Sequence, residues 1–448
     1  MQYRLIALTL TIIGLAAAEG PNLGDKDFYP SDEHPVGFRG DGNGHFPGAT
    51  PPLNFQEGTA VRKDIPDTGK KGDDAPEPKE HWVLTDNKAV NLCWKTEMPG
   101  WGNTQPIIVG DRVYVKGDPH WLVCVSLDDG KILWQTSNSP LLFDGKKHSE
   151  QEIADYQSLF NFSRVCQALS YVVHFDGRGK NREERLKKWL AENLDDVKSV
   201  RQTLDKAKSQ VAKLAPDLVG EVEEMITVLQ STIDKGTEPN LKGGFEKSLQ
   251  KELRIPTRGA WSAMVGWSVS APVSDGAQVY AHFGQEQVVC YDLDGELRWG
   301  RLLPARDLGA GRVRVQHLPS PLLIGQVLVV QAKDYLAGLD KATGQTLWEA
   351  DVSVGSGYNV GTHKHLTLHD GDTSVDIIAT TNGVILRASD GKVLAELPFR
   401  HGKEGGGPSV IGVDDVIVFE KYRGPEATKK GPAYWRGRLV LKGDTVTL

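Results

Sequence analysis

The sequence has no excess of basic residues and no basic block. Its 52 lysines and arginines are outnumbered by 59 aspartates and glutamates, which leaves a formal net charge of −7. Proteins that bind nucleic acids usually carry a basic patch or stripe that neutralises phosphates. The composition therefore argues against a nucleic acid as the partner.

Cysteine is also scarce, with four residues in 448. Cys124 and Cys290 each precede a glycine turn in two of the repeats described below, and Gly338 fills the same place in a third. A disulfide needs α-carbons within about 7 Å, which separate repeats seldom allow, whereas a buried cysteine often acts as a small apolar residue. Cys93 and Cys166 have no evident mates, so no disulfide is predicted.

Long apolar runs are missing except at the start of the chain. Arg4 supplies a positive end, Leu5–Leu15 an apolar core and Ala16–Ala18 a small-residue cleavage site. This order predicts a secretory signal peptide over residues 1–18, because a membrane-spanning helix needs about 20 apolar residues. No cysteine follows the apolar core, so no lipid anchor is expected. The mature chain is expected to be periplasmic or secreted.

Several motifs of common enzyme and metal sites are absent as well. Gly405–Gly407 has neither the spacing nor the strand–helix context of a phosphate-binding loop, and no Gly-x-Ser-x-Gly motif occurs. Asp41, Asn43 and His45 have a faint likeness to the first ligands of a calcium loop. The acidic residue that closes such a loop would be Pro52, so no metal site is predicted.

What the chain has instead is a repeated pattern of four short apolar runs. In the clearest copy the runs are Leu322–Ile324, Val327–Gln331, Leu336–Leu339 and Gln345–Trp348, with turns between them. Such a pattern predicts a four-stranded antiparallel meander. Because one meander cannot bury both of its faces, it needs neighbours of the same kind.

These neighbours occur on both sides of the clearest copy. Three copies run from a proline to a tryptophan over nearly equal lengths: Pro106 to Trp134, Pro272 to Trp299 and Pro321 to Trp348. A weaker copy spans 365–395, and a fifth begins at Pro408. Four-stranded repeats of this period predict an all-β fold, namely a β-propeller with its blades around a central channel.

The third turn and last run of these copies resemble the blade motif of the PQQ-like repeat family. The motif is Leu339–Trp348 in one copy, with shorter matches at Asp128–Trp134 and Asp292–Trp299. This family of quinoprotein-type propellers includes PQQ dehydrogenases and the outer-membrane assembly protein BamB. The resemblance covers residues 90–140 and 262–448. It implies that the blade tryptophans pack between adjacent blades; they are Trp94, Trp134, Trp299 and Trp348.

An N-terminal extension over residues 19–88 precedes the expected propeller start at 89–145. Within it, Gly37–Gly44 resembles a leader that often precedes such propellers in exported bacterial proteins. Residues 62–80 are charged, contain proline and lack apolar periodicity. They predict a flexible linker.

Residues 146–256 interrupt the propeller, which is expected to resume over 257–448. Ser149 and Glu152 have the spacing of a capping box. They predict the start of a helix that runs to about Val173.

Two apolar seams follow in the same insertion. The first runs at heptad-like spacing from Leu186 to Leu214, Pro216 stops it, and the second runs from Leu218 to Leu229. They predict an antiparallel helical hairpin with a tight turn. This hairpin either caps one face of the propeller or docks a partner, and the sequence supports the two equally.

The sequence leaves the number of blades open. Five starts are visible, whereas rings of the family usually have seven or eight blades. Trp94, in a strand expected at 89–95, matches the closing tryptophan of a blade, so this strand is expected to complete the last blade. That blade has runs at 416–420, 434–441 and 445–448. Either a five-bladed ring closes in this way, or the sequence is cut short and leaves an open edge. Truncation is favoured because the blades of the resembling family pack at an angle suited to larger rings.

The residues just before each first strand are expected to surround one mouth of the channel. Polar and aromatic groups that converge in a concave site are typical of ligand binding. The candidate ligand-binding residues are Trp101, Asn103, Gln105, Trp267, Ser268, His317, His363 and His365. The two neighbouring histidines alternate and so point to one side of a strand. Turn formation and channel solvation explain the same residues, and the histidines fall short of a metal site.

Two functions from different classes remain. The first is an exported, monomeric, non-catalytic propeller that binds or scaffolds a protein, peptide or glycan without a cofactor. The second is a PQQ-dependent quinoprotein oxidoreductase acting on alcohols or sugars. The resembling dehydrogenases use calcium-bound acids, a catalytic aspartate, a stacking tryptophan and, in alcohol dehydrogenases, an adjacent cysteine pair. That set cannot be placed in this sequence, so the first function is favoured and no catalytic residue is assigned.

Overall fold

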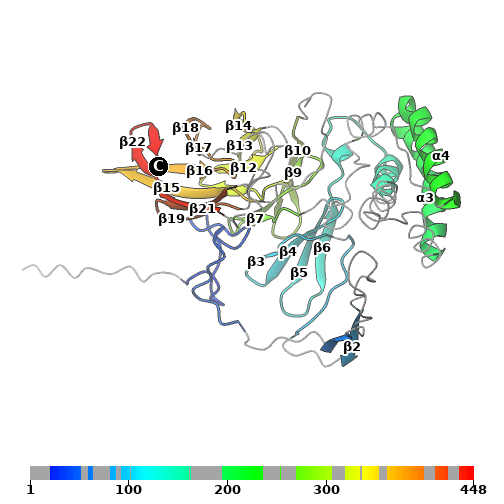
Figure 1. Ribbon diagram of the computed structural model, residues 1–448, viewed down its shortest axis with the longest axis horizontal. Helices are drawn as coiled ribbons and strands as arrows, with labels where there is room; N and C mark the ends of the chain where they lie inside the picture. The colour runs from blue at the N-terminus through cyan, green and yellow to red at the C-terminus, as the bar shows by residue number, and fades with distance from the viewer. Residues whose placement is uncertain are drawn as a thin grey trace, which may run out of the picture.

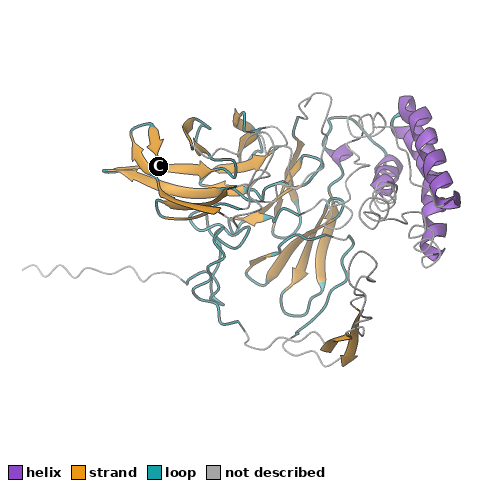
Figure 2. Ribbon diagram, viewed as in Figure 1, coloured by secondary structure: helices purple, strands orange, loops and turns teal. Residues whose placement is uncertain are grey.

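The computed structural model of this protein shows mainly β-sheet, with helices at one end (Figures 1 and 2). The β part contains four consecutive four-stranded antiparallel sheets, which are the blades, and a divided fifth repeat. This confirms the predicted fold of four-stranded blades. The structure describes residues 21–51, 59–63, 81–86, 92–100, 102–160, 162, 194–235, 253, 269–304, 318–332, 335–352, 361–397, 409–421 and 433–448.

The first two blades each pair four strands in chain order. Blade one consists of β3 (Ile107–Val109), β4 (Arg112–Gly117), β5 (Trp121–Ser126) and β6 (Ile132–Ser137). Blade two consists of β7 (Val273–Ser274), β8 (Gln278–His282), β9 (Gln287–Asp292) and β10 (Leu297–Leu302). In both blades the first strand begins directly after the repeat-opening proline, as the sequence predicted.

Blades three and four keep the same strand order. Blade three consists of β11 (Leu322–Ile324), β12 (Val327–Gln331), β13 (Leu336–Asp340) and β14 (Thr346–Ala350). Blade four consists of β15 (Lys364–Asp370), β16 (Thr373–Ala379), β17 (Val384–Arg387) and β18 (Val393–Glu396). Blade four lacks the proline and the tryptophan, but alternating residues such as Leu366 and Leu368 are still buried and hold it in place.

The fifth repeat is divided between two sheets. One sheet contains β19 (Ile411–Val413), β20 (Val416–Lys421) and β21 (Ala433–Arg438), and the other contains β22 (Val440–Lys442) and β23 (Thr445–Thr447). The predicted single run over 434–441 is therefore wrong. The chain leaves the first sheet at Leu439, whose N–H donates to the Asp415 carbonyl at 2.7 Å. Leu441 and Val446 then pack into the core shared with blade four.

Neighbouring blades share apolar cores, so the middle strands are buried on both faces. This explains why β12 reads as a nearly continuous apolar run instead of an alternating one. Each of the four shared cores contains residues of two neighbouring repeats. Examples are Tyr114 with Val289, Cys290 with Leu328, Leu336 with Ile378, and Leu366 with Ile417.

The four blade tryptophans each dock onto the next blade in the chain. Each indole N–H donates to a carbonyl in the third turn of that blade, at 2.7–3.0 Å. Each ring also covers the glycine of the same turn, where an added Cβ would come within 2.8 Å of the ring. The pairs are Trp94 with Gly130, Trp134 with Gly295, Trp299 with Gly344, and Trp348 with Gly391. This tryptophan ladder is the inter-blade packing that the family resemblance implied.

Trp94 also overturns an expectation of the sequence. Residues 92–98 form no strand, and β23 pairs with β22. Within the described part of the chain, the segment around Trp94 therefore does not complete the last blade. Instead Trp94 and Met98 pack against Val113 and Val123 and cover the outer face of blade one.

The cysteines lie where the repeats predicted them. Cys124 and Cys290 are buried and free, and each faces a blade tryptophan across the sheet, as Gly338 does in blade three. An added Cβ at Gly338 would lie 2.2 Å from the ring of Trp348. Gly338 therefore has no room for a side chain, whereas the equivalent positions of blades one and two hold the small side chains of Cys124 and Cys290. Cys166 lies outside the described residues.

The helical insertion stands beside blade one, at the opposite end of the molecule from β22 (Figure 1). Residues 150–160 are helical, and the predicted capping box is present. The Ser149 N–H donates to Glu152 Oε2 at 2.7 Å, and the Glu152 N–H donates to Ser149 Oγ at 3.2 Å. A short 3-10 turn, η1 (Pro140–Leu142), connects β6 to this region.

The predicted hairpin is formed by α3 (Leu194–Leu214) and α4 (Val219–Lys235), which are joined by the 3-10 turn η2 (Pro216–Leu218). Leu204, Ala207 and Val211 of the first seam are buried in one core with Tyr156 and Phe160. The same core contains the whole second seam, which is Leu218, Val222, Met225 and Leu229. None of the described helices is long and apolar enough to cross a membrane.

The N-terminal extension has more structure than the sequence predicted. β1 (Thr59–Lys63) and β2 (His81–Asp86) form an antiparallel hairpin on either side of the charged tract. Residues 64–80 lie outside the described part, so the linker prediction is untested there. Residues 21–51 pack along the blades, below β7 and β19 in Figure 1.

Candidate functional site at the inner strand ends

Half of the predicted ligand-binding residues can be placed. Trp101, Trp267, Ser268 and His317 lie outside the described residues. Asn103 is exposed, and Gln105 is half-buried. The side-chain oxygen of Gln105 accepts a hydrogen bond from the Arg39 N–H at 3.0 Å, so the N-terminal extension already contacts this position.

His363 is buried between blades three and four, with 4% of its surface exposed. Its Nδ1 accepts a hydrogen bond from the Thr381 N–H at 3.2 Å, so Nε2 carries the proton and donates to Gln331 Oε1 at 2.8 Å. Burial lowers the pKa of His363 to about 3. The imidazole is therefore neutral, and it joins two blades.

His365 has a different environment. Its Nε2 lies 2.9 Å from Asp376 Oδ1, which also accepts a hydrogen bond from the Thr367 hydroxyl. Its side chain is about one-third exposed. The two histidines alternate as predicted, but each contacts a different set of partners, so they do not converge on one ligand.

The sequence reasoning missed a second set of buried polar residues, which lie at or next to the end of the second strand of each blade. They are Lys116, His282, Gln331 and Thr380, which are all buried. Each ends an apolar run with a polar side chain, and this break was the available signal. In blade three the Gln331 side-chain N–H groups donate to the carbonyls of Ala332, Tyr335 and Val352 at 2.7–2.9 Å.

Lys116 is the most unusual of these residues. Only 2% of its surface is exposed. Its Nζ donates to Ser270 Oγ at 2.6 Å and to the His282 carbonyl at 2.5 Å, and it lies 5.0 Å from the centre of the Phe283 ring. Burial lowers the pKa of Lys116 to about 7, and the nearby Asp118 carboxylate opposes this shift. A large part of Lys116 is thus neutral near pH 7.

The polar groups around Lys116 continue along the junction of blades one and two. Gln287 donates from Nε2 to the Asn138 carbonyl at 2.8 Å, and the Tyr291 hydroxyl donates to Asn138 Oδ1 at 2.7 Å. His120, from the turn before β5, packs its ring against Tyr156 and Phe160 of the helical insertion. This junction therefore links both blades to the insertion.

Lys116 and Ser270 have little scope for catalysis because both are engaged in hydrogen bonds within the protein. A neutral lysine amine beside a serine hydroxyl is one form of activated nucleophile. Here, however, the Ser270 hydroxyl donates to the His282 carbonyl at 3.0 Å, and both residues are buried. In the described part of the chain, no three His, Cys, Asp or Glu side chains come together as a metal ion would require.

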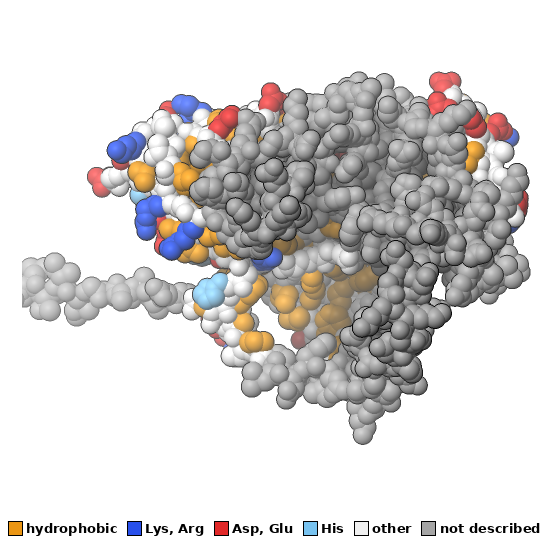
Figure 3. Space-filling model, in the orientation of Figure 1, with side chains coloured by type: hydrophobic (Ala, Val, Ile, Leu, Met, Phe, Trp, Pro, Cys, Tyr) orange, Lys and Arg blue, Asp and Glu red, His pale blue; other side chains and the backbone are white. Residues whose placement is uncertain are grey.

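Among the side chains that Figure 3 colours by type, no broad basic field is visible on this face. Blue and red side chains are interspersed around the end of the molecule that carries β15 and β22. This distribution agrees with the net negative charge of the sequence.

Stacked four-stranded blades joined by a tryptophan ladder define a propeller-type repeat protein. Residues 247–416 match the family model described as "Outer membrane protein assembly factor BamB". This match agrees with the resemblance to the PQQ-like repeat family that the blade motif at Leu339–Trp348 indicated. No curated protein sequence matches the chain.

Solved structures with similar folds include BamB from Moraxella catarrhalis, at 13% identity and a TM-score of 0.35, covering 81% of this chain and 70% of that one. Another is the quinohemoprotein alcohol dehydrogenase ADHIIG from Pseudomonas putida HK5, at 10% identity and a TM-score of 0.32. That match covers 73% of this chain but only 38% of the dehydrogenase. Similarities this low carry no argument about function.

Proposed function

We propose that this chain is a non-catalytic binding or scaffolding propeller of an exported compartment, periplasmic or extracellular. The observation that carries the proposal is the match of residues 247–416 to an assembly-factor family model. A protein that assists assembly works through surfaces that bind other proteins. Its partner is a protein, peptide or glycan, and the proposal includes no cofactor.

The inner strand ends support this proposal. His363, Gln331 and Thr381 hold one another across two blades, and Lys116 is held by Ser270 and a backbone carbonyl. Side chains used in this way stabilise a scaffold, because His363, Gln331, Thr381 and Lys116 each bond to other groups of the protein. The helical insertion adds a second candidate binding surface. It packs around a core of its own, so its outer side is not needed to hold the blades together.

The competing function is a PQQ-dependent oxidoreductase. Its calcium would need several converging oxygen ligands, and the described residues provide no such group. We therefore derive no reaction step through this centre.

The two functions are separated by reconstitution of the exported chain with PQQ and calcium. We expect no dye-linked oxidation of alcohols or sugars above the cofactor-free control. We also expect saturable binding to members of a peptide pool or a glycan array. Activity that depends on both PQQ and calcium would overturn the proposal.

Export is tested on the secreted product itself. We expect N-terminal sequencing of that product to show cleavage after Ala18. Retention of residues 1–18 on a cytoplasmic product would contradict the exported location.

A further inference from the structure

The N-terminal strap, residues 29–43, contacts all five repeats. The Tyr29 hydroxyl donates to the Gly276 carbonyl at 2.9 Å, and its ring packs on Gly110. Further along, strap residues contact blade three, the start of blade four and β19. Those three contacts are Asp32 with Lys341, the Asp41 carbonyl with Lys364, and Asn43 with Gly412. The strap therefore follows a path that the blades create together.

The middle of the strap pairs with a sheet edge through one antiparallel backbone bridge. The Val36 N–H donates to the Ser274 carbonyl, and the Ser274 N–H donates to the Val36 carbonyl, both at 2.9 Å. Ser274 belongs to β7, which is an edge strand of blade two. The Val36 side chain is 6% exposed and enters the core between blades one and two. Backbone pairing at a sheet edge, with a pocket for one side chain, is a common mode of peptide recognition.

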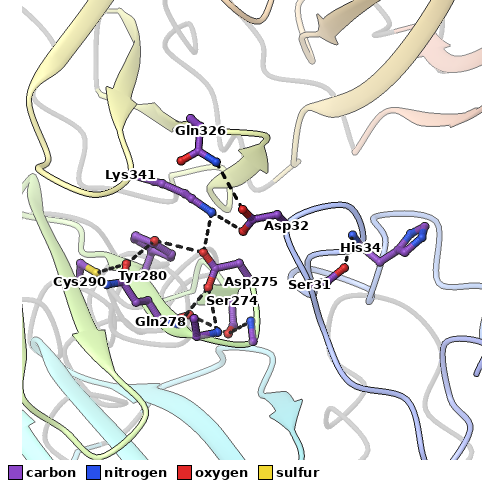
Figure 4. A network of polar contacts seen from close by, with 12 residues as sticks. Ser31, Asp32, His34, Ser274, Asp275, Gln278, Tyr280, Cys290, Gln326 and Lys341 are labelled. Atoms are coloured by element: carbon purple, nitrogen blue, oxygen red, sulfur yellow. Dashed lines mark hydrogen bonds and ion pairs between the residues drawn. The ribbon is translucent and has the colours of Figure 1, made fainter. Parts of the chain in front are cut away.

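Charge complements this pairing at blade three. Lys341 Nζ forms an ion pair with Asp32 of the strap (Figure 4). It also forms one with the buried Asp275 of blade two, whose Oδ2 lies 2.9 Å away. Gln326 donates from Nε2 to the other oxygen of Asp32 at 3.3 Å. Lys341 is mostly buried while Asp32 is half-exposed. The blades thus provide a fixed cation, and the strap provides an accessible acid.

A glycine turn ends the bound segment. The Gly37 N–H donates to the Gly40 carbonyl at 2.8 Å, and the Gly40 N–H donates to the Gly37 carbonyl at 3.0 Å. A Cβ at Gly37 would lie 3.1 Å from Val273, so the backbone lies close to blade two at this point. Beyond the turn, Lys364 Nζ donates to the Asp41 carbonyl at 2.7 Å. Lys364 is itself buried, with 7% of its surface exposed.

The strap nevertheless lies on the surface of the blades and is not part of their cores. Asp32, Glu33, His34, Arg39 and Asp41 are all exposed. Val36 is the strap side chain that joins a core cluster, and it contributes one backbone bridge instead of a ladder. A contact of this size is small compared with the shared cores between blades.

We propose that the path filled by the strap is an exchangeable peptide-binding groove, and that the strap is its intrachain occupant. The partner in trans is an extended acidic peptide with the same pattern: a tyrosine, an acid three residues later, and an aliphatic residue four residues after the acid, followed by a glycine turn. The tyrosine hydroxyl, the acid and the aliphatic side chain are read by Gly276, Lys341 and the core between blades one and two. This inference deepens the proposed binding function and rests on it.

The experiment uses the full chain with a specific protease site inserted between Pro51 and Pro52. After cleavage the strap is held only by its contacts with the blades. A fluorescently labelled synthetic peptide of residues 21–51 is then added, and its anisotropy is followed. We expect saturable binding that unlabelled peptide competes away. Uncleaved protein should bind the label more weakly, because its own strap acts at a high effective concentration.

Peptide variants test the recognition pattern. Asp32→Asn in the peptide should weaken binding about three- to tenfold, since it removes the charge that faces Lys341. Asp27→Asn is the matched control: Asp27 is also an exposed acid of the same segment, and its replacement should change binding less than about twofold.

Three outcomes would overturn the inference. They are a strap that neither leaves nor exchanges after cleavage, equal binding of a scrambled peptide, and equal effects of Asp32→Asn and Asp27→Asn. These outcomes concern peptide exchange, whereas the proposed function is contradicted by a different measurement, namely activity that depends on PQQ and calcium. Failure of the groove is therefore distinguishable from failure of the proposed binding function.

Discussion

Two regions of each blade differ in how regularly their contacts repeat. These regions are the third turn, called the outer turn here, and the end of the second strand, called the inner strand end. At the outer turns the same contact occurs four times: a tryptophan N–H donates to a carbonyl, and its ring covers a glycine of the following blade. Near the end of the second strand the four blades have Lys116, His282, Gln331 and Thr380, and each makes different bonds.

This difference teaches where a repeat protein keeps its stability and where it can vary. The tryptophan ladder needs the same residues in each repeat because the packing geometry is the same. The inner ends can change from blade to blade as long as each buried polar group finds a partner. Residues that vary in this way are the natural place for individual properties of the chain.

The largest effect is expected at the ladder. Trp348→Ala should lower the free energy of unfolding by about 3–5 kcal/mol, the usual range for removing a large buried aromatic side chain. Trp348 is 8% exposed and docks on blade four. Trp94→Ala is the comparison, and it should cost less because Trp94 is only partly buried. An unchanged urea midpoint for Trp348→Ala would show that the ladder does not stabilise the blades.

The glycines of the ladder give a sharper test. Gly344 and Gly325 both have positive φ, at 71° and 55°, but a Cβ would meet Trp299 at 2.5 Å only in Gly344. Gly325→Ala should cost about 1 kcal/mol for the backbone alone. Gly344→Ala should cost about 1–3 kcal/mol more, from overpacking. Equal denaturant midpoints for the two variants would contradict the ring–glycine contact.

A further prediction concerns pH at the inner ends. The pKa of Lys116 falls from 10.5 to about 7 on folding, so between these values the unfolded chain binds a proton that the folded chain does not. The contribution of Lys116 to the stability should therefore rise as pH increases above 7, by up to about 1.4 kcal/mol per pH unit. Lys116→Met should remove that part of the slope in urea titrations between pH 7 and pH 9.5.

The control for this prediction is Lys206→Met, because Lys206 is an exposed lysine of α3. Its replacement should leave the slope as in the unaltered protein. A wild-type slope in Lys116→Met would show that Lys116 keeps its charge in the folded protein.

The smallest effect on the blades is expected from removing the helical insertion. Replacement of residues 146–256 by a short Gly/Ser bridge should leave a folded β protein, because the described helices share a core of their own. Helical circular dichroism should fall, and cooperative melting of the β part should remain. Loss of that melting would make the insertion part of the propeller core, through contacts such as those of His120 with Tyr156 and Phe160.

Much of the fold could be predicted because its signals are local in sequence. The blade runs, the Ser149–Glu152 capping box and the stop at Pro216 each depend on residues a few positions apart. Short-range periodicity and turn chemistry decide such features before any tertiary contact forms. The blade tryptophans were found in the same way, since their spacing repeats.

The sites were predicted less well because they depend on which blades meet. His363 reads as a ligand in the sequence, but Gln331 and Thr381 from two blades satisfy it. Lys116 was missed because its environment is made by Ser270 and His282, more than 150 positions away along the chain.

The sequence by itself thus determined the strands of blades one to four, the order in which they pair, and the positions of the ladder tryptophans. Only the tertiary structure decided that the fifth repeat divides at Leu439, that Trp94 docks onto blade one, and that Val36 and Asp32 bind across the blades. The physical reason is the range of the forces involved. Periodicity acts within a strand, whereas the burial and partner of a polar group are set by chain segments that meet only after the blades have packed.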